Sequence, residues 1–422
     1  MLKFLRLSVL VLLAVSLVIV SGTFLVSSRS SIAAEKEITI GALLFPTGPG
    51  ASSGLPMAQG FWDFFRDLDE KGGINGIKVN FKWLDWRWEV PLGMTSYEKL
   101  VADPKVLCIL GGASVLNVAI AKRPDEDRMP YLAPWQPAPS VWPTMKYRFF
   151  TDLTYADIAR ATVKWTVEKH WKGSGPPKVG VIYHDNAFGY SFLDPIVAYA
   201  NEGGGYKVVA TKALPPTAVD CSSQVLAMKA ADADYVYLAI LTAPAISVTK
   251  EMKKQGLKAV ACGPPHALSP ALPVATEGAA EGCIIATTDS LWTENIPGMQ
   301  YWRKKAHEYS PRQPADWPWM LGGYFLGPKA GIVTVEAVKR AIAKVGYENL
   351  TRDVIRDSIE SISNLSTGDI SPPIGFTKED HRGHNAVKMI SIRGGKWTVL
   401  SDWFEAPPVP AWEKLGKSKP TD

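Results

Sequence analysis

The segment LCILGGASVLN, residues 107–117, places a glycine turn and a serine between a predicted strand and a predicted helix. A helix N-terminus carries free backbone N–H donors and partial positive charge, so it can stabilise an anion. We therefore expect Ala113, Ser114 and the backbone after Gly112 to contact an anionic group of a ligand, such as a carboxylate. The alternative is that Ser114 caps its helix, and the two roles are compatible.

Other patterns that could carry chemistry are weaker. The sequence has no HExxH motif of zinc peptidases and no GxxxxGK[ST] phosphate-binding loop. His381 and His384 are spaced as metal ligands on a helix would be, but the surrounding glycine and polar residues favour a solvated loop. Ser53, in the segment GASSG, could contact a ligand or form a simple Gly/Ser turn. We predict no catalytic residue, no metal site and no cofactor.

The four cysteines, Cys108, Cys221, Cys262 and Cys283, are far apart and form no CxxC pair. Cys262 and Cys283 each lie in a short strand-like run, so in an exported protein they are the one candidate disulfide. Buried free thiols are the alternative.

An alternation of strands and helices must position these residues. From Glu37 onward, short β-branched runs alternate with amphipathic segments of helical length, and a second set of the same kind begins near Asp157. This alternation predicts an α/β fold with parallel sheets covered by helices on both faces. Residues 297–362 supply helices without enough strands for a sheet, so they should pack on a lobe already formed. Residues 386–400 predict terminal strands joined by an Arg-Gly-Gly turn.

Length and charge indicate a two-lobed globular protein. The chain has 422 residues, 46% hydrophobic and 21% charged, which is too long for one ordinary core. Its formal charge of +5 falls to +2 if Lys3, Arg6 and Arg29 leave with an N-terminal segment, because 43 basic and 41 acidic residues remain. A charge so close to neutral gives no reason to expect nucleic acid or an anionic membrane as a partner.

The N-terminus has the order of a secretory signal: basic residues in MLKFLR, an apolar stretch from Leu7 to Val26, then small residues. We expect residues 1–34 to be a signal peptide cleaved after Ala33 or Ala34, giving a soluble protein in the periplasm or another extracytoplasmic compartment. The apolar stretch is also long enough to remain as an anchor. The first 107 residues contain no cysteine, so a lipoprotein anchor is not expected.

Several segments together resemble the branched-chain amino-acid receptor family of ABC-importer binding proteins. The resemblance begins with ITIGALLFPTGPGASSG, continues through MAQGFWDFFRDLDEKGGINGIKVNFKWLD and LVADPKVLCILGGAS, and extends to KVGVIYHDNAFGYS, ADADYVYLAI, MKKQGLKAVACGPP and AAEGCIIAT. Each motif alone is weak, whereas their order and spacing are specific. The resemblance covers about Glu37 to about Phe376.

The resemblance implies the type I periplasmic binding protein fold: two Rossmann-like lobes with mainly parallel sheets, joined by three hinge crossings. We expect a signal peptide over residues 1–34, a first lobe over 35–152 plus 289–372, and a second lobe over 153–288 plus 373–422. It also implies a monomeric receptor that binds a small molecule in the cleft between the lobes and delivers it to the membrane permease of an ABC importer. Closure of the lobes around the ligand would signal the bound state.

Ligand contacts are expected at positions that match the family's pattern or flank the same cleft. They are Ser53, Ala113, Ser114, Trp135, Gln136, Phe188, Thr242, His266 and Trp319. Where amino-acid receptors have an acidic residue after Gly-Pro, this chain has Pro265, followed by His266. The anion that would pair with an α-ammonium group is missing, and an unpaired buried ammonium costs several kcal/mol.

Aromatic residues replace the missing polar groups. Trp135, Phe188 and Trp319 could form walls for a flat or apolar body, although each could also be an ordinary core or surface residue. The predicted ligand is therefore a carboxylate with an apolar or aromatic body. Two other functions share the same features: a ligand-sensing subunit of a signalling receptor and, with less support, an exported hydrolase.

Overall fold

The computed structural model describes residues 36–134, 136–267, 272–311 and 323–409. The predicted signal peptide, Trp135 and Trp319 therefore lie outside the described residues. Within the described part of the chain, no helix is long and apolar enough to cross a membrane.

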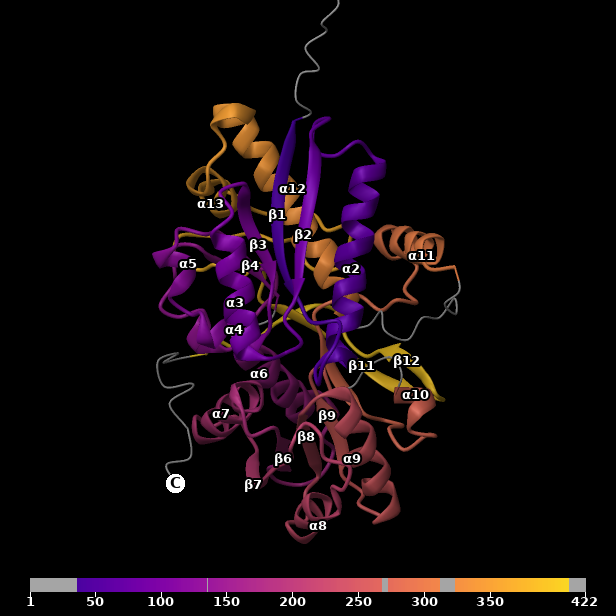
Figure 1. The fold of residues 1–422 in the computed structure, drawn as a ribbon. Helices are drawn as coiled ribbons and strands as arrows, with labels where there is room; N and C mark the ends of the chain where they lie inside the picture. The colour runs from indigo at the N-terminus through magenta and orange to yellow at the C-terminus, as the bar shows by residue number, and fades with distance from the viewer. Residues whose placement is uncertain (1–35, 135, 268–271, 312–322, 410–422) are drawn as a thin grey trace, which may run out of the picture. The chain divides into compact units, whose positions relative to one another are not determined.

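The first sheet has five strands in the order β2-β1-β3-β4-β5 (Figure 1). The strands are β1 (Glu37–Leu44), β2 (Lys78–Asp85), β3 (Val106–Gly111), β4 (Tyr131–Ala133) and β5 (Arg148–Phe150). The β1–β3, β3–β4 and β4–β5 pairs are parallel, with Ala42 opposite Leu110. β1 and β3 are almost wholly buried, as expected for strands covered on both faces.

Helices from two distant parts of the sequence cover this sheet. They are α2 (Ala51–Glu70), α3 (Val90–Val101), α4 (Ser114–Ala119), α5 (Arg123–Glu126), α11 (Pro297–Tyr309), α12 (Leu326–Val345) and α13 (Arg352–Glu360), with a 3-10 turn, η4 (Tyr347–Asn349). α12 packs on α2 and α13, and α11 packs on α2. The late helices thus pack on the first sheet, which confirms the sequence prediction.

The second sheet has the order β12-β11-β10-β9-β8-β6-β7, with β13 paired to β11. The strands are β6 (Lys178–Tyr183), β7 (Lys207–Ala213), β8 (Tyr235–Ala239), β9 (Val260–Gly263), β10 (Ile284–Thr287), β11 (Ala386–Arg393), β12 (Lys396–Val399) and β13 (Phe404–Glu405). β6 to β10 are parallel, and β11 is antiparallel to β10 and β12. The turn at Gly394-Gly395 joins the last long pair, as predicted.

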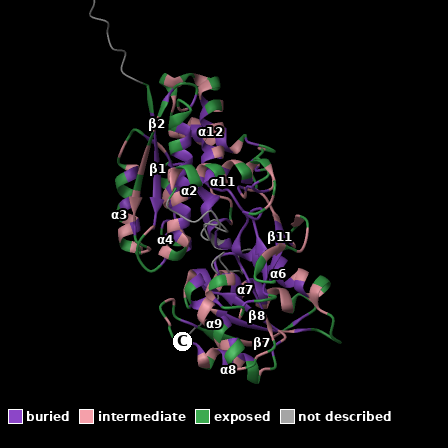
Figure 2. Ribbon diagram, turned by 90° about the vertical axis from the view of Figure 1, so that its right-hand side faces the viewer, coloured by how far each residue is buried: buried purple, intermediate pink, exposed green. Residues whose placement is uncertain are grey.

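Helices also cover the second sheet (Figure 2). Its central strands are buried, whereas the edge strands β7 and β12 are largely half-buried or exposed. The covering helices are α6 (Tyr155–Trp165), η2 (Thr166–His170, a π-helical turn), α7 (Ala187–Asn201), α8 (Ser222–Ala230), α9 (Thr242–Lys254) and α10 (Leu272–Ala275). The short 3-10 turn η1 (Ala138–Ser140) lies between β4 and β5 and packs on α4. The α/β class with two mainly parallel sheets is confirmed. The lobe limits 35–152 plus 289–372 and 153–288 plus 373–422 stay a prediction.

The four cysteines are buried free thiols, so the candidate disulfide between Cys262 and Cys283 is not formed. Cys262 lies in the same core cluster as Tyr237 and Ile284, its neighbours across the sheet. Cys283 precedes Ile284 in the chain and belongs to the core cluster on the other face. The two thiols point to opposite faces because side chains alternate along a strand.

Candidate ligand-binding site

Ser114 lies where β3 ends and α4 begins. Gly111 and Gly112 have φ values of 91° and 83°, and a Cβ on Gly112 would come 2.1 Å from the Tyr131 hydroxyl, so this turn requires glycine. The N-cap of α4 is Ala113, and no side chain caps the helix. Ser114 is instead the first helical residue and is only 1% exposed. The interpretation of Ser114 as a helix cap is therefore wrong.

The Ser114 side chain is hydrogen-bonded with Tyr155, the first residue of α6. A capping box fixes this start of α6, because Thr154 Oγ1 accepts from the Asp157 backbone N–H at 3.2 Å and Asp157 accepts from the Thr154 N–H at 2.8 Å. Burial raises the pKa of Tyr155 above its usual value, and the Ser114 hydrogen bond partly offsets that effect. Two hydroxyls, one from each sheet's helices, thus meet at the carboxyl end of β3.

Aromatic rings surround Tyr155. Its ring centroid lies 5.6 Å from that of Phe188 and 5.3 Å from that of His266, both edge-on. Phe188 and His266 contact each other at 5.3 Å, and Phe192 packs behind them, 4.8 Å from Tyr155. Tyr155, Phe188, Phe192 and His266, here called the aromatic cluster, therefore form one continuous wall.

Local hydrogen bonds fix the positions of two members of the aromatic cluster. Asn186 caps α7 by accepting from the Phe188 N–H at 3.0 Å, which fixes Phe188 in the first turn. Thr242, at the start of α9, donates its hydroxyl to the His266 carbonyl at 2.9 Å. Burial lowers the pKa of His266 to about 3, so its imidazole is neutral near pH 7.

A buried charged group lies next to the aromatic cluster. The Lys329 ammonium is 2.5 Å from Asp152 Oδ1 and 2.6 Å from Asp289 Oδ1, and all three side chains are fully buried. His384 Nε2 lies 3.4 Å from the same Asp152 oxygen. These four residues, here called the lysine cluster, join α12 to the segments that follow β5 and β10 and precede β11.

The charged groups of the lysine cluster pair with one another. Burial alone would raise the pKa of Asp152, but the Lys329 ammonium and His384 hold it below the usual value. Burial raises the pKa of Asp289 to about 6, because one ammonium serves both carboxylates. Asp152 also acts electrostatically on Tyr155 and His266, so it lies near the aromatic cluster, yet its carboxylate is already paired with the Lys329 ammonium.

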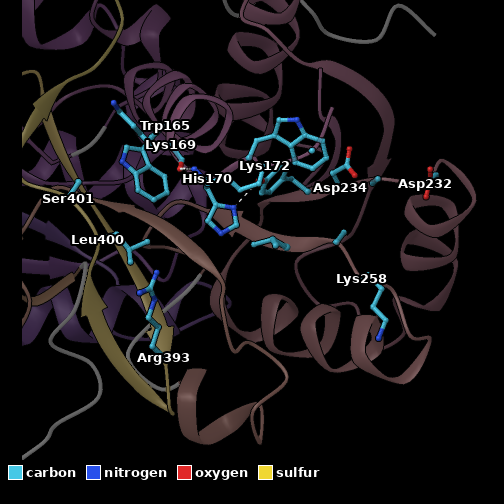
Figure 3. Close-up of a pocket in the computed structure, with 16 residues that line it drawn as sticks. Trp165, Lys169, His170, Lys172, Asp232, Asp234, Lys258, Arg393, Leu400 and Ser401 are labelled. Atoms are coloured by element: carbon cyan, nitrogen blue, oxygen red, sulfur yellow. Dashed lines mark hydrogen bonds between the residues drawn. The ribbon is translucent and has the colours of Figure 1, made fainter. Parts of the chain in front are cut away.

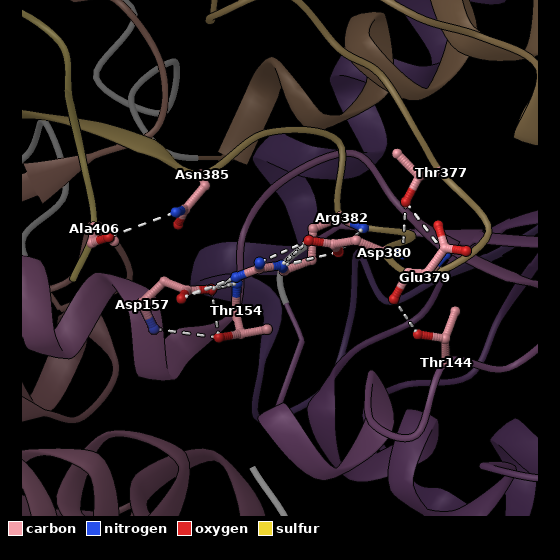
Figure 4. A network of polar contacts seen from close by, with 9 residues as sticks. All are labelled: Thr144, Thr154, Asp157, Thr377, Glu379, Asp380, Arg382, Asn385 and Ala406. Atoms are coloured by element: carbon pink, nitrogen blue, oxygen red, sulfur yellow. Dashed lines mark hydrogen bonds and ion pairs between the residues drawn. The ribbon is translucent and has the colours of Figure 1, made fainter. Parts of the chain in front are cut away.

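A second ion network fixes the start of α6 (Figure 4). The Arg382 guanidinium donates to Asp157 at 3.0 Å and to Asp380 at 2.7 Å. His381, next to it, is 2% exposed, stacks on Phe149 at 4.1 Å and hydrogen-bonds the Arg148 carbonyl at 2.7 Å.

The predicted solvated loop around His381 and His384 is therefore wrong. Tertiary contacts bury both imidazoles, the side chain of His384 being 4% exposed. No cluster of candidate metal ligands occurs among the described residues.

The remaining predicted site residues divide into three groups. Gln136 is fully buried and its carbonyl accepts the Tyr155 N–H at 2.9 Å, so it adjoins the aromatic cluster. Ala113 and Ser53 are half-buried at the starts of α4 and α2. Trp135 and Trp319 lie outside the described residues. The structure thus brings Ser114, Gln136, Phe188, Thr242 and His266 around Tyr155.

The segment GASSG around Ser53 has the GxSxG spacing of serine hydrolases. A nucleophile elbow requires that serine on a sharp turn between a strand and a helix. Here residues 45–50 separate β1 from α2, and Ser52 is an exposed residue of the first helical turn. The segment therefore lacks the setting of a nucleophile.

The sequence alone did not point to Tyr155, Asp152, Asp289 or Lys329. The Thr154-x-x-Asp157 capping box was the one local signal that a helix begins at Tyr155. The lysine cluster has no local signal, because Lys329 meets Asp152 across 177 residues of sequence.

Comparison with known proteins agrees with this fold. Leu/Ile/Val-binding protein homolog 7 of Brucella abortus is 23% identical over 86% of this chain and 90% of its own length. Leu/Ile/Val-binding protein homolog 3 of Brucella melitensis is 25% identical over 55% of this chain, and Leu/Ile/Val-binding protein BraC3 of Rhizobium johnstonii is 24% identical over 51%. The chain spans less than two thirds of these last two relatives, 62% and 58% of their lengths.

Solved structures share the whole fold. A branched-chain amino acid ABC transporter protein from Thermus thermophilus with bound valine superposes with a TM-score of 0.81 at 20% identity, over 88% of this chain and 97% of that one. A fatty acid ABC transporter substrate-binding protein from Thermomonospora curvata superposes with a TM-score of 0.77 at 24% identity, over 89% and 94%. The family model for periplasmic binding proteins matches residues 37–396, and the chain therefore belongs to the periplasmic binding protein family.

Proposed function

We propose that this protein is the extracytoplasmic solute-binding receptor of an ABC importer, and that its ligand is a small carboxylate with an apolar or aromatic body. Membership of the periplasmic binding protein family supports the receptor class and a place outside the cytoplasm. The observation that carries the ligand class is the absence of an available acid at the aromatic cluster, as judged from the described residues. The protein acts as a monomeric, cofactor-free binding protein rather than an enzyme, with a membrane permease as its partner.

The carboxylate end of the ligand binds at the hydroxyls of Ser114 and Tyr155. Both are hydrogen-bond donors in a buried place, where a bond to an ionised group is worth more than a bond to a neutral one. The backbone after Gly112 adds donors at the same turn. A ligand carboxylate would join or replace the present hydrogen bond between Ser114 and Tyr155.

The body of the ligand packs on the aromatic cluster. The ring of Phe188 offers a large apolar surface, and the neutral His266 adds a second ring without a charge. Trp135 and Trp319, predicted from the sequence, would extend this wall. The same fold includes a fatty acid ABC transporter substrate-binding protein and a protein with bound valine, so the fold accepts ligands with and without an ammonium group.

Among the described residues, an α-ammonium group would find no unpaired acid at the aromatic cluster. Pro265 stands where amino-acid receptors have an acid, and the nearby Asp152 is already paired with Lys329. Burying an ammonium without such a partner costs several kcal/mol. This cost disfavours leucine, isoleucine and valine as ligands.

Binding is coupled to closure of two lobes over 35–152 plus 289–372 and 153–288 plus 373–422. Ser114 belongs to the helices of the first sheet, whereas Tyr155, Phe188 and His266 belong to those of the second. A ligand that contacts residues from both groups of helices gains its full affinity only when the two lobes are closed. Binding therefore shifts the population toward the closed form that the permease recognises.

A thermal-shift screen tests the ligand class. Purified protein is heated with aromatic acids, short aliphatic acids and amino acids, since a ligand that binds the folded state raises the melting temperature. We expect the largest shifts from aromatic or branched apolar acids, and Trp135→Ala should reduce the shift from a ring-bearing acid more than that from a short aliphatic one. Shifts confined to leucine, isoleucine and valine would contradict the proposal.

A further inference from the structure

A cavity lies at the opposite end of the second sheet's strands from the aromatic cluster. The aromatic cluster lies at the carboxyl ends of β8 and β9, near Thr242 and His266, whereas this cavity lies at their amino ends, near Tyr235 and Val260. Its volume is about 1010 Å³, large enough for an organic ligand. We call it the amino-end groove; its main lining residues are Trp165, Lys169, His170, Trp171, Lys172, Tyr235, Lys258, Arg393 and Leu400.

Aromatic side chains form one part of the amino-end groove (Figure 3). His170 Nδ1 lies 2.8 Å from the Tyr235 hydroxyl, and its ring is 6.3 Å from Trp165. Trp171 packs edge-on against Tyr235 at 6.1 Å, and its indole N–H donates to the Gly175 carbonyl at 2.8 Å. Trp165 and Trp171 are half-buried, so part of each indole remains open to the groove. The π-helical turn η2 carries His170, and such turns are frequent at functional sites.

Cations without acidic partners line the rest of the amino-end groove. In the described chain, no carboxylate forms an ion pair with Lys169, Lys172, Lys258 or Arg393. The two acids of the groove are engaged elsewhere, since Asp232 pairs with the Lys178 ammonium and Asp234 accepts the Lys178 backbone N–H at 2.7 Å. The groove therefore holds excess positive charge.

Two of these cations lie close to the aromatic side chain of His170. Burial lowers the pKa of His170, and Arg393 and Lys172 lower it further. Both cations are therefore close enough to act on the ring electrostatically. Figure 3 shows Trp165, His170, Leu400 and Arg393 around one opening, with Lys172 beside them.

We propose that the amino-end groove is a second ligand-binding site, and that it takes an aromatic anion. The ring packs on Trp165, His170 and Leu400, and the carboxylate or sulfonate lies between Arg393 and Lys172. Arginine matches the planar geometry of a carboxylate, and lysine adds a mobile charge that follows the ligand. This site shares no residue with the aromatic cluster, so it stands independently of the transported ligand.

The test uses fluorine NMR of the protein labelled with 5-fluorotryptophan, with 2-naphthoate as the probe. Trp165→Phe and Trp171→Phe assign the two resonances of interest among the 15 tryptophans. We expect 2-naphthoate to shift both resonances, whether or not it also binds elsewhere. The neutral analogue naphthalen-2-ylmethanol should shift them far less, because it lacks the charge.

Two matched double variants separate site-specific charge from general charge. K172Q/R393Q should raise the 2-naphthoate concentration needed for the shifts by at least about tenfold, the equivalent of losing one charged hydrogen bond. K207Q/K212Q removes the same charge from exposed positions on β7, outside the groove, and should change it less than about twofold. Unmoved Trp165 and Trp171 resonances, equal responses to the neutral alcohol, or equal losses in the two double variants would overturn the proposal.

Discussion

The lysine cluster and the aromatic cluster are neighbours with opposite chemistry. The lysine cluster brings one ammonium and two carboxylates together with no exposure to solvent. The aromatic cluster contains rings, hydroxyl groups and an imidazole whose pKa is lowered to about 3 by burial. Asp152 influences residues of both, because it pairs with Lys329 and acts on Tyr155 and His266.

This difference is the basis of the proposed ligand class. Lys329 pairs with both Asp152 and Asp289, so a ligand ammonium would have to compete with Lys329 for either carboxylate. Under the proposed function, the lysine cluster joins the segments around the two sheets, and the aromatic cluster takes the apolar body of the ligand. Four changes test this division of roles.

The largest effect should come from Lys329→Met. Removing the ammonium leaves two buried carboxylates facing each other, and breaking a buried ion pair in this way costs about 3–5 kcal/mol. We expect the free energy of unfolding in urea to fall by that amount.

Two controls make the Lys329 measurement specific. Lys250→Met breaks the exposed Lys250–Glu277 pair and should cost less than about 1 kcal/mol. Adding Asp152→Asn and Asp289→Asn to Lys329→Met should recover part of the loss, because the uncompensated charges are gone. Equal losses from Lys329→Met and Lys250→Met would contradict the role given to the lysine cluster.

Acid should destabilise the protein through His266. Its pKa is near 6.5 in the unfolded chain and lowered to about 3 in the fold, so the unfolded state binds the proton first as pH falls. Its stabilising contribution is complete above pH 6.5 and is lost toward pH 3, by up to about 1.4 kcal/mol per pH unit.

His266→Phe isolates the contribution of His266 to the pH dependence of stability, because the variant keeps a ring and removes the titrating group. Asp63 and Asp289, whose pKa values burial raises to about 6, contribute with the opposite sign, but they are present in both proteins. We expect the wild type to lose about 2 kcal/mol relative to the variant between pH 6.5 and 4.5, measured by urea unfolding. Parallel pH profiles would contradict this account, because they would show that folding does not lower the pKa of His266.

Ser114→Ala should weaken binding of the preferred acid by about 1–3 kcal/mol, the usual effect of removing a hydrogen bond to a charged group. Isothermal titration calorimetry measures the loss. Ser223→Ala, an exposed change in α8, is the control and should leave the affinity unchanged. An unchanged affinity in Ser114→Ala would restrict Ser114 to its contact with Tyr155.

The smallest effect should come from Phe188→Leu, which keeps an apolar side chain and removes the ring. Aromatic pairs contribute about 0.5–1.5 kcal/mol beyond the area they bury. Affinity for an aromatic acid should fall by that amount more than affinity for a branched aliphatic acid. Equal losses for both acids in calorimetry would assign Phe188 to the core of α7 alone.

The sequence predicted the parts of the fold that depend on local patterns. β-branched runs alternating with amphipathic segments predicted both sheets, and the Gly111-Gly112 turn predicted where Ser114 would lie. Phe188 and His266 could be predicted to meet, because both follow the carboxyl ends of parallel strands in one sheet.

Features that depend on distant contacts could not be predicted. The segment GPKAGIV shows Lys329 as one charge in an apolar run, and nothing local names Asp152 or Asp289 as its partners. The polar composition around His381 indicated a solvated loop, whereas Phe149 and Arg148 bury that histidine. Strand-like runs around Cys262 and Cys283 gave no information about which face each thiol would occupy.

The most direct test of the ligand class is calorimetry with pairs of compounds that differ only in the ammonium group. Leucine is compared with 4-methylpentanoate, and phenylalanine with 3-phenylpropanoate, under identical buffer conditions. Because the described residues offer no unpaired acid at the aromatic cluster, each amino acid should bind at least about tenfold more weakly than its partner acid. Tighter binding of leucine than of 4-methylpentanoate would show that the chain supplies an anion for the ammonium group and would contradict the proposed ligand class.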